Sequence, residues 1–323
     1  MSNRSLAMSG SRLTAEEAAS LEKQVNQEPR DINSRTKLLG YYFHKQLEDP
    51  SMQKAHQESV LWLIQNAPES EILALPFGLL FAKINAVGYS QGKNAWIDQL
   101  KLDPENLQLL ENAAKFFMLT DPELAEESLL KAQSLDKNNP KWSAELGQLY
   151  SLNIIKKSGN NERAEAKRAL DQLEISYNLS SGIEQAALLA QLANAAMAAQ
   201  ETTKAKEYAE IMLSKDGSDW NSGDNIHHGN ITLGRIAFAA GDVKTAKEHL
   251  LKAGNTSGSP QLNSFGPNMS LAKELLQEGE KDVVLKYLVL CAKFWESGKD
   301  RLEKWLITVK EGRIPESWHK PRP

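Results

Sequence analysis

The stretch "LGRIAFAAGDVKTAKEHLLKAG" (residues 233–254) decides the fold. In it the small residue Gly234 is followed after 12 positions by Ala246, after four more by Leu250 and after three more by Ala253. Small residues at fixed places let two antiparallel helices approach closely, and larger apolar residues fill the space between neighbouring pairs. The spacing therefore predicts a pair of packed helices.

The same spacing recurs along the chain, so the helix pair is predicted to be a repeat. Three further copies keep the spacing: Ala113, Ala125, Leu129 and Ala132; Ala193, Ala205, Ala209 and Met212; Ala272, Val284, Leu288 and Cys291. A copy with an insertion of ten residues has Gly147, Ala169, Leu173 and Ser176. Looser copies open with "LLGYYF" (residues 38–43) and "FGLLFA" (residues 77–82).

Sequence patterns at both ends of the repeat region predict a helix that closes it. Thr14 and Glu17 in "LTAEEAASLEKQVNQEP" form a capping box, which predicts a short leading helix. In "KDRLEKWLITVKEG", one helical face would carry Leu302, Trp305, Leu306 and Val309, and that face could shield the last pair from water. No run of residues alternates apolar and polar side chains with a period of two, so the chain is predicted to be all-α.

Three segments resemble tetratricopeptide-repeat (TPR) proteins: "AELGQLY", "DPELAEESLLKAQSLDKNNP" and "TLGRIAFAAGDVKTAKEHLLKAG". The step of 34 residues from Ala113 to Gly147 has the length of that family's repeat, whereas the later steps of 46, 41 and 38 are longer. The resemblance implies a right-handed α-solenoid of antiparallel helix pairs, capped at both ends. We expect an N-terminal segment and capping helix at residues 1–30, a TPR-like array at 31–295, and a closing helix and tail at 296–323.

Composition excludes several classes of function. With 38 basic and 42 acidic residues the net charge is −4, so no overall positive field would attract nucleic acid or an anionic membrane. The single cysteine, Cys291, excludes an internal disulfide and a clustered-cysteine zinc site. The N-terminal residues lack the apolar stretch of a secretory signal, and no apolar run is long enough to span a bilayer. We expect a cytoplasmic protein with no cofactor.

The motif "GDNIHHGN" (residues 223–230) suggests a metal site or an acid–base pair. His227 and His228 are adjacent, however, so on a helix their side chains diverge by about 100° and do not easily share one metal ion. The sequence instead predicts a helix over 225–240 with Asp224 as its N-cap, His228 facing a ligand and His227 turned aside. Phosphate-binding, zinc-protease and serine-hydrolase motifs are absent from the sequence, and Cys291 occupies a packing position of the repeat.

The predicted binding surface lies on the first helices of the last pairs. His228, Thr232 and Arg235 share one face of the helix, and the TPR resemblance implies that such faces line the inner, concave surface. Cations interleaved with hydroxyl and amide groups suit a carboxylate ligand. The candidate residues are His228, Thr232, Arg235, Asn194, Asn230, Asn268, Ser270 and Lys273. In the alternative interpretation, Arg235 and Lys273 are solvated or paired with glutamates of the next helix.

Two long connections lie near this surface. Residues 254–268 contain Pro260, Gly266 and Pro267, which predict a non-helical loop that could cover the groove with Phe265. Residues 214–225 form a second polar connection that presents Trp220.

Three functions remain open at this point. The favoured one is a scaffold that captures a peptide or protein segment with acidic groups on the concave surface of the C-terminal repeats. The second is an enzyme or small-molecule binder with a closed pocket around His228 and the 254–268 loop. The third is a scaffold that assembles with a second copy of itself. TPR-like folds serve many purposes, so the fold does not choose among them.

Overall fold

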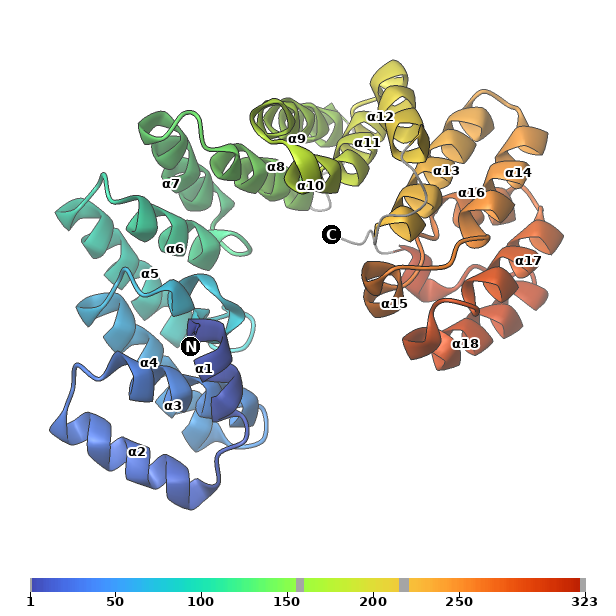
Figure 1. Cartoon of the computed structure of the whole chain (residues 1–323). Helices are drawn as coiled ribbons and strands as arrows, with labels where there is room; N and C mark the ends of the chain where they lie inside the picture. Colours follow the sequence, from blue (N-terminus) through green and yellow to red (C-terminus); the bar gives the residue numbers. More distant parts are fainter. Residues whose placement is uncertain (1, 155–159, 215–220, 320–323) are drawn as a thin grey trace. The chain divides into compact units, whose positions relative to one another are not determined.

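The computed structural model describes residues 2–154, 160–214 and 221–319, and every regular element within them is helical (Figure 1). The chain divides into two compact units, Met1–Leu149 and Tyr150–Pro323. The predicted all-α class is therefore confirmed for the described ranges.

Unit 1 contains short helices that pack on their neighbours in sequence. They are α1 (Asn3–Gly10), α2 (Ala15–Gln27), α3 (Ile32–Lys45), α4 (Pro50–Asn66), the 3-10 helices η1 (Glu71–Ala74) and η2 (Pro76–Gly78), α5 (Ala86–Leu102), α6 (Leu107–Phe117) and α7 (Pro122–Leu135). The boundary between the units falls within α8 (Pro140–Ile154).

Unit 2 continues the pattern, with α13 packed on α14 and α16, and α17 packed on α14 and α18. Its elements are α9 (Asn160–Leu179), α10 (Gly182–Ala187), α11 (Leu189–Ala198), α12 (Thr202–Ser214), α13 (Ser222–Ala239), α14 (Val243–Gly254), α15 (Pro260–Phe265), α16 (Ser270–Gln277), α17 (Lys281–Cys291), η3 (Glu296–Gly298), α18 (Lys299–Lys310) and η4 (Glu316–His319).

The repeat spacing identifies the packing positions of five helix pairs. Each copy places its first small residue on one helix and its other three residues on the next long helix, as Gly234 on α13 and Ala246, Leu250 and Ala253 on α14. Every residue of the five complete copies is buried. The prediction of paired helices with buried small residues is confirmed in α6–α7, α11–α12, α13–α14 and α16–α17, which pack on each other.

Of the two looser copies, residues 38–43 lie on α3, which packs on α4, whereas residues 77–82 differ from the prediction. Residues 77–82 do not open an α-helix: η2 ends at Gly78, and the chain then turns until Asn85 caps α5. Pro76 supplies no N–H, and a Cβ at Gly78 would lie 2.6 Å from the carbonyl oxygen of Ile72, so the chain is held in a tight turn. The 3-10 helices contact α3 and α6, the places where a first helix of this pair would pack.

The leading helix α2 is confirmed with its capping box. The Thr14 N–H donates to Glu17 Oε2 at 2.8 Å, and the Glu17 N–H donates to Thr14 Oγ1 at 3.2 Å. The sequence analysis missed α1, which packs on α3 through Gly10 and Gly40. At the other end, the closing helix α18 buries Leu302, Trp305 and Val309 as predicted, whereas Leu306 is half-buried.

In each unit, one carboxylate accepts hydrogen bonds from a tyrosine and a lysine of a nearby helix. Asp121, just before α7, accepts a hydrogen bond from Tyr89 Oη at 2.6 Å and one from Lys93 Nζ at 2.7 Å. Tyr89 and Lys93 are one turn apart on α5, so both reach the same carboxylate. A second group of this kind is formed by Glu174 of α9 with Lys204 and Tyr208 of α12.

Two predictions about the region around α13 need correction. The helix begins at Ser222 with Asn221 as its N-cap, and Asp224 lies in the first turn, where its Oδ1 accepts from Ser259 Oγ at 2.8 Å. The 254–268 connection is not wholly non-helical, because α15 begins at Pro260. A proline at the first helical position loses no hydrogen bond, so here it starts a helix. The expectation for Trp220 lies outside the described residues.

Candidate functional site

The two adjacent histidines lie in different surroundings. His227, predicted to turn aside, has no exposed surface, whereas His228 is half-buried. His227 Nδ1 lies 2.9 Å from the carbonyl oxygen of Ala253, and its Nε2 lies 2.9 Å from the backbone nitrogen of Asn268. A carbonyl only accepts and an N–H only donates, so Nδ1 carries the proton and Nε2 accepts. His227 thereby ties α13 to the end of α14 and to the loop before α16.

Aromatic rings surround this histidine. Its ring stacks on Tyr287 of α17, with the centroids 6.4 Å apart, and meets Phe294 edge-on at 6.3 Å. Tyr287 Oη donates to the carbonyl oxygen of Asn268 at 2.8 Å, which holds the same loop from the opposite side. His227 is therefore a structural centre of unit 2, a role that its position in the sequence did not reveal.

The predicted ligand-binding residues make contacts within the protein. Arg235 pairs with Glu274 of α16, with Nη2 and Oε1 2.8 Å apart, as in the alternative interpretation. Asn230 Oδ1 accepts from His249 Nδ1 at 2.9 Å, and Asn268 Oδ1 accepts from the Ser270 N–H at 2.9 Å.

The remaining predicted residues differ in exposure. Thr232 is buried, Ser270 and Lys273 are half-buried, and Asn194 is exposed on α11. Ser270 Oγ and Glu274 Oε2 are buried without a hydrogen-bond partner among the described residues. Arg235 thus contacts α16, the helix that carries Ser270 and Lys273. None of the hydrogen bonds and ion pairs given above joins Asn194 of α11 to these residues.

Burial affects the titration of several histidines. It lowers the pKa of His56, His228 and His249 below the ordinary value of 6.5. The Phe77 carbonyl acts in the opposite direction on His56, and so does the Asp224 charge on His228. The folded state therefore favours the neutral imidazoles.

We expect stability to fall in mild acid. The unfolded chain binds more protons than the folded chain between pH 6.5 and the lowered pKa values. The stabilisation is complete above pH 6.5 and is lost as the pH falls through the folded pKa values. Urea midpoints measured from about pH 7.5 to about pH 5 should decrease, and less steeply in His228→Gln, which cannot titrate. An equal decrease in wild type and variant would contradict the role of His228.

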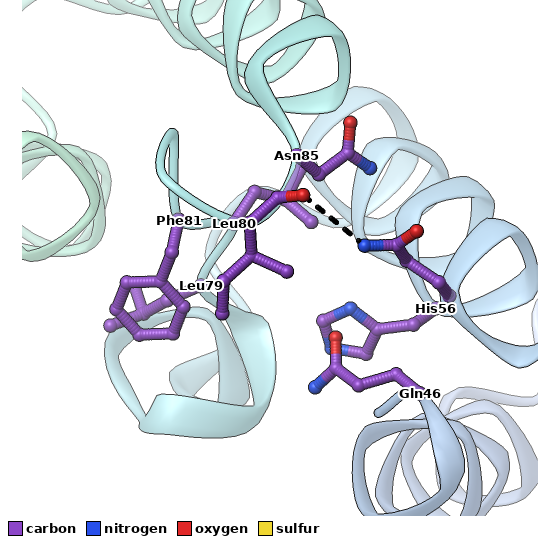
Figure 2. A pocket seen from close by; sticks show the side chains of 8 residues that line it. Gln46, His56, Leu79, Leu80, Phe81 and Asn85 are labelled. Carbon is purple, nitrogen blue, oxygen red and sulfur yellow. Dashed lines mark hydrogen bonds between the residues drawn. The ribbon is translucent and has the colours of Figure 1, made fainter. Parts of the chain in front are cut away.

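A small cavity in unit 1 contains a histidine but leaves little room for a ligand. His56, Gln46 and Asn85 border it together with the 79–81 segment, and Gln53 Nε2 donates to the Ile84 carbonyl oxygen at 3.4 Å (Figure 2). Its volume is about 10 Å³, roughly the space of one water molecule. His56 Nε2 donates to the carbonyl oxygen of Phe77 at 2.7 Å, so the ring is held in place by the protein itself.

A much larger groove lies over α14, α17 and α18, with a volume of about 760 Å³. Its floor is apolar: Leu251, Leu285, Val289, Leu290 and Leu306. Its polar lining residues are Lys252, Lys286, Lys293, Lys310 and Asn255. We call this surface the Leu–Lys groove. The closed-pocket hypothesis requires a cavity that contains His228, but His228 lines neither this groove nor the small cavity in unit 1.

The charges of the Leu–Lys groove have one sign. All four lysines are exposed, no carboxylate lines the groove, and the ion pairs between described residues do not include these lysines. The chain as a whole is acidic, so the cluster is a local reversal of charge. Such a surface can attract an anionic partner and hold its apolar groups on the floor.

The groove also lies close to His227. Ala253, Tyr287 and Phe294, which contact His227, each directly follow one of the groove lysines: Lys252, Lys286 and Lys293. Consecutive residues of a helix point about 100° apart, so Ala253 and Tyr287 point inward from α14 and α17 while Lys252 and Lys286 point toward the groove. Lys293 and Phe294 lie in the turn after α17. The spacing of Lys286, Val289 and Lys293 could indicate an exposed stripe that begins on α17 and ends in the turn after it, but not the helices that flank it.

Two other kinds of site are absent from the described residues. No group of three or more His, Cys, Asp or Glu side chains is placed to hold a metal ion. Within the same ranges, no helix combines the length and the apolar composition that a bilayer crossing requires. Cys291 is buried, and burial raises the pKa of its thiol, which disfavours the reactive thiolate.

No protein-family model matches the chain, and no curated protein matches it.

Proposed function

We propose that the chain is a TPR-like protein, a right-handed α-solenoid of antiparallel helix pairs closed by a helix at each end. The support is the spacing of small and apolar residues that recurs in five helix pairs and is buried in all of them. Repeats of this kind provide extended surfaces for binding other proteins. The proposed place of action is the cytoplasm, where a lone buried cysteine is common.

The proposed function is that of a binding scaffold, which holds a protein segment rich in carboxylates and apolar side chains. The observation that carries the proposal is the Leu–Lys groove, in which four exposed lysines surround an apolar floor with no carboxylate in the lining. The concave-face residues support it less well, because Glu274 already neutralises the guanidinium of Arg235. The proposed binding surface is therefore the Leu–Lys groove on α14, α17 and α18, and not the face formed by α13 and α16.

The test compares three baits in a pull-down from source-cell lysate. Lys286→Glu/Lys293→Glu reverses two groove charges, and Lys304→Glu reverses an exposed charge on α18 that does not line the groove. We expect at least one protein to be retained by wild type and by Lys304→Glu and to be lost at least about tenfold with the double variant, as two lost charge contacts would cause. Equal retention by all three baits would overturn the proposal.

A second measurement locates the contact. A photo-cross-linking residue at Val289, which is 56% exposed on the groove floor, should label the retained partner. The same residue at Ile307, which is 60% exposed on α18 but does not line the groove, should not label it. Because the attraction is between charges near the surface, retention should also weaken as salt shortens the screening length.

A further inference from the structure

We infer that the segment held in the Leu–Lys groove is an α-helix with acidic residues on both sides of an apolar stripe. This inference rests on the proposed function and adds the conformation and charge pattern of the partner. It follows from the hydrogen-bonding capacity, the length and the charge of the groove.

The floor of the groove cannot satisfy the backbone of an extended peptide. The floor side chains are all apolar, and Asn255 is the uncharged polar residue of the lining. An extended segment would bring unpaired N–H and C=O groups onto this apolar surface, and each group that loses water without a new partner weakens binding. The described ranges contain no strand whose edge could pair with such a segment. A helix satisfies its own backbone and presents only side chains.

The shape of the floor suits a short helix. On α17 the groove lining runs from Leu285 to Leu290, a length of roughly 8 Å at 1.5 Å per residue, and Lys293 follows in the turn after the helix. The end of α14 flanks this stripe with Leu251, and α18 flanks it with Leu306. A partner helix of two to three turns would cover the stripe with apolar side chains at positions i, i+3 or i+4, and i+7.

The lysines determine the charge of that helix. Lys252 lies on α14, Lys286 on α17, Lys293 in the turn just after α17, and Lys310 at the end of α18, so positive charge comes from all three helices and from that turn. A bound helix would therefore meet lysines on both of its flanks, where Glu or Asp pairs best. The four floor leucines are half-buried, whereas Val289 and the four lysines are exposed.

The experiment is a selection from a displayed library of random 16-residue peptides against the full chain. Parallel selections use Val289→Glu, Lys286→Glu/Lys293→Glu and the control Ile307→Glu, all at exposed positions. Each of the best peptides is then synthesised in three versions: unchanged, with a central proline, and with lysine in place of glutamate. Their affinities are measured by fluorescence anisotropy and their helicity by circular dichroism. A central proline costs a helix about 3 kcal/mol, so a helical ligand should lose about a hundredfold in affinity.

Each outcome decides the inference. The inference holds if two results are obtained. First, wild type and Ile307→Glu enrich peptides that have apolar residues every three to four positions and acidic flanks, and the groove variants do not. Second, the versions of these peptides with proline or lysine bind at least tenfold more weakly. Peptides that depend on the groove but tolerate the central proline would overturn the helical conformation and leave the proposed function intact. If no enriched peptide depends on the groove, both fail.

Other occupants are distinguished in the same way. Binding of phosphatidylserine vesicles, lost in Lys286→Glu/Lys293→Glu without any groove-dependent peptide, would assign the groove to a lipid surface and overturn the inference. Self-association in sedimentation that disappears in Val289→Glu would assign it to a second copy of the chain and overturn it as well.

Discussion

Replacing His227 should destabilise unit 2 more than any other single change to its polar residues. We expect His227→Ala to lower the free energy of unfolding by about 3–5 kcal/mol, since it leaves a cavity and two buried backbone groups without partners. The groups are the Ala253 carbonyl and the Asn268 N–H, which His227 joins in a site with no exposed surface. Urea unfolding, with hydrogen exchange of the α14 and α17 peptides, measures the loss.

Two companion variants separate the causes. His227→Phe keeps most of the volume but neither hydrogen bond, so a loss of about 2–4 kcal/mol would measure the two unpaired groups. His228→Ala, at the neighbouring half-buried residue, should cost about 1 kcal/mol or less. If His227→Phe is as stable as wild type, the two hydrogen bonds do not hold the loop to α13 and α14.

We expect Gly40→Ala to destabilise the full chain but to stabilise a chain that lacks α1. A Cβ at Gly40 would lie 1.9 Å from the carbonyl oxygen of Ala7, and one at Gly10 would lie 2.0 Å from that of Lys37. The two helices α1 and α3 therefore cross at a distance that only glycine allows. We expect Gly40→Ala to displace α1 and to cost about 2–3 kcal/mol, the usual effect of overpacking a tight contact.

The control is the same substitution in a chain that begins at Arg12 and so lacks α1. There Gly40→Ala should stabilise by about 0.5–1 kcal/mol relative to the truncated parent, because alanine is the better helix former. The measurement is urea unfolding of the four chains in parallel. A destabilisation of equal size with and without α1 would show that the α1–α3 contact is not the reason for the glycine.

Much of the fold could be predicted because it depends on local periodicity. Ala125, Leu129 and Ala132 lie one turn apart on a helix wherever that helix sits, so their spacing alone indicated a buried face. The capping box of Thr14 and Glu17 is likewise a local device, and it is present as predicted. Predictions were weaker where proline and glycine allow two outcomes, as at Pro260, which begins α15 instead of preventing a helix.

The candidate site could be predicted only in part. Adjacent histidines in a helix must point in different directions, and that much follows from the sequence. Which one is buried depends on Ala253, Asn268 and Tyr287, which come from other elements. The alternative considered for Arg235, pairing with a glutamate of the next helix, is the arrangement that the structure contains.

The sequence by itself determined the all-α class, the helix-pair packing positions and the closing helices, because these depend on residues within about one or two turns of each other. The tertiary structure alone decided that His227 joins three segments and that Lys252, Lys286, Lys293 and Lys310 surround one apolar floor. Those residues are far apart in the chain, and helical periodicity does not determine which distant faces meet. That depends on how whole helices pack, and the proposed binding surface depends on it too.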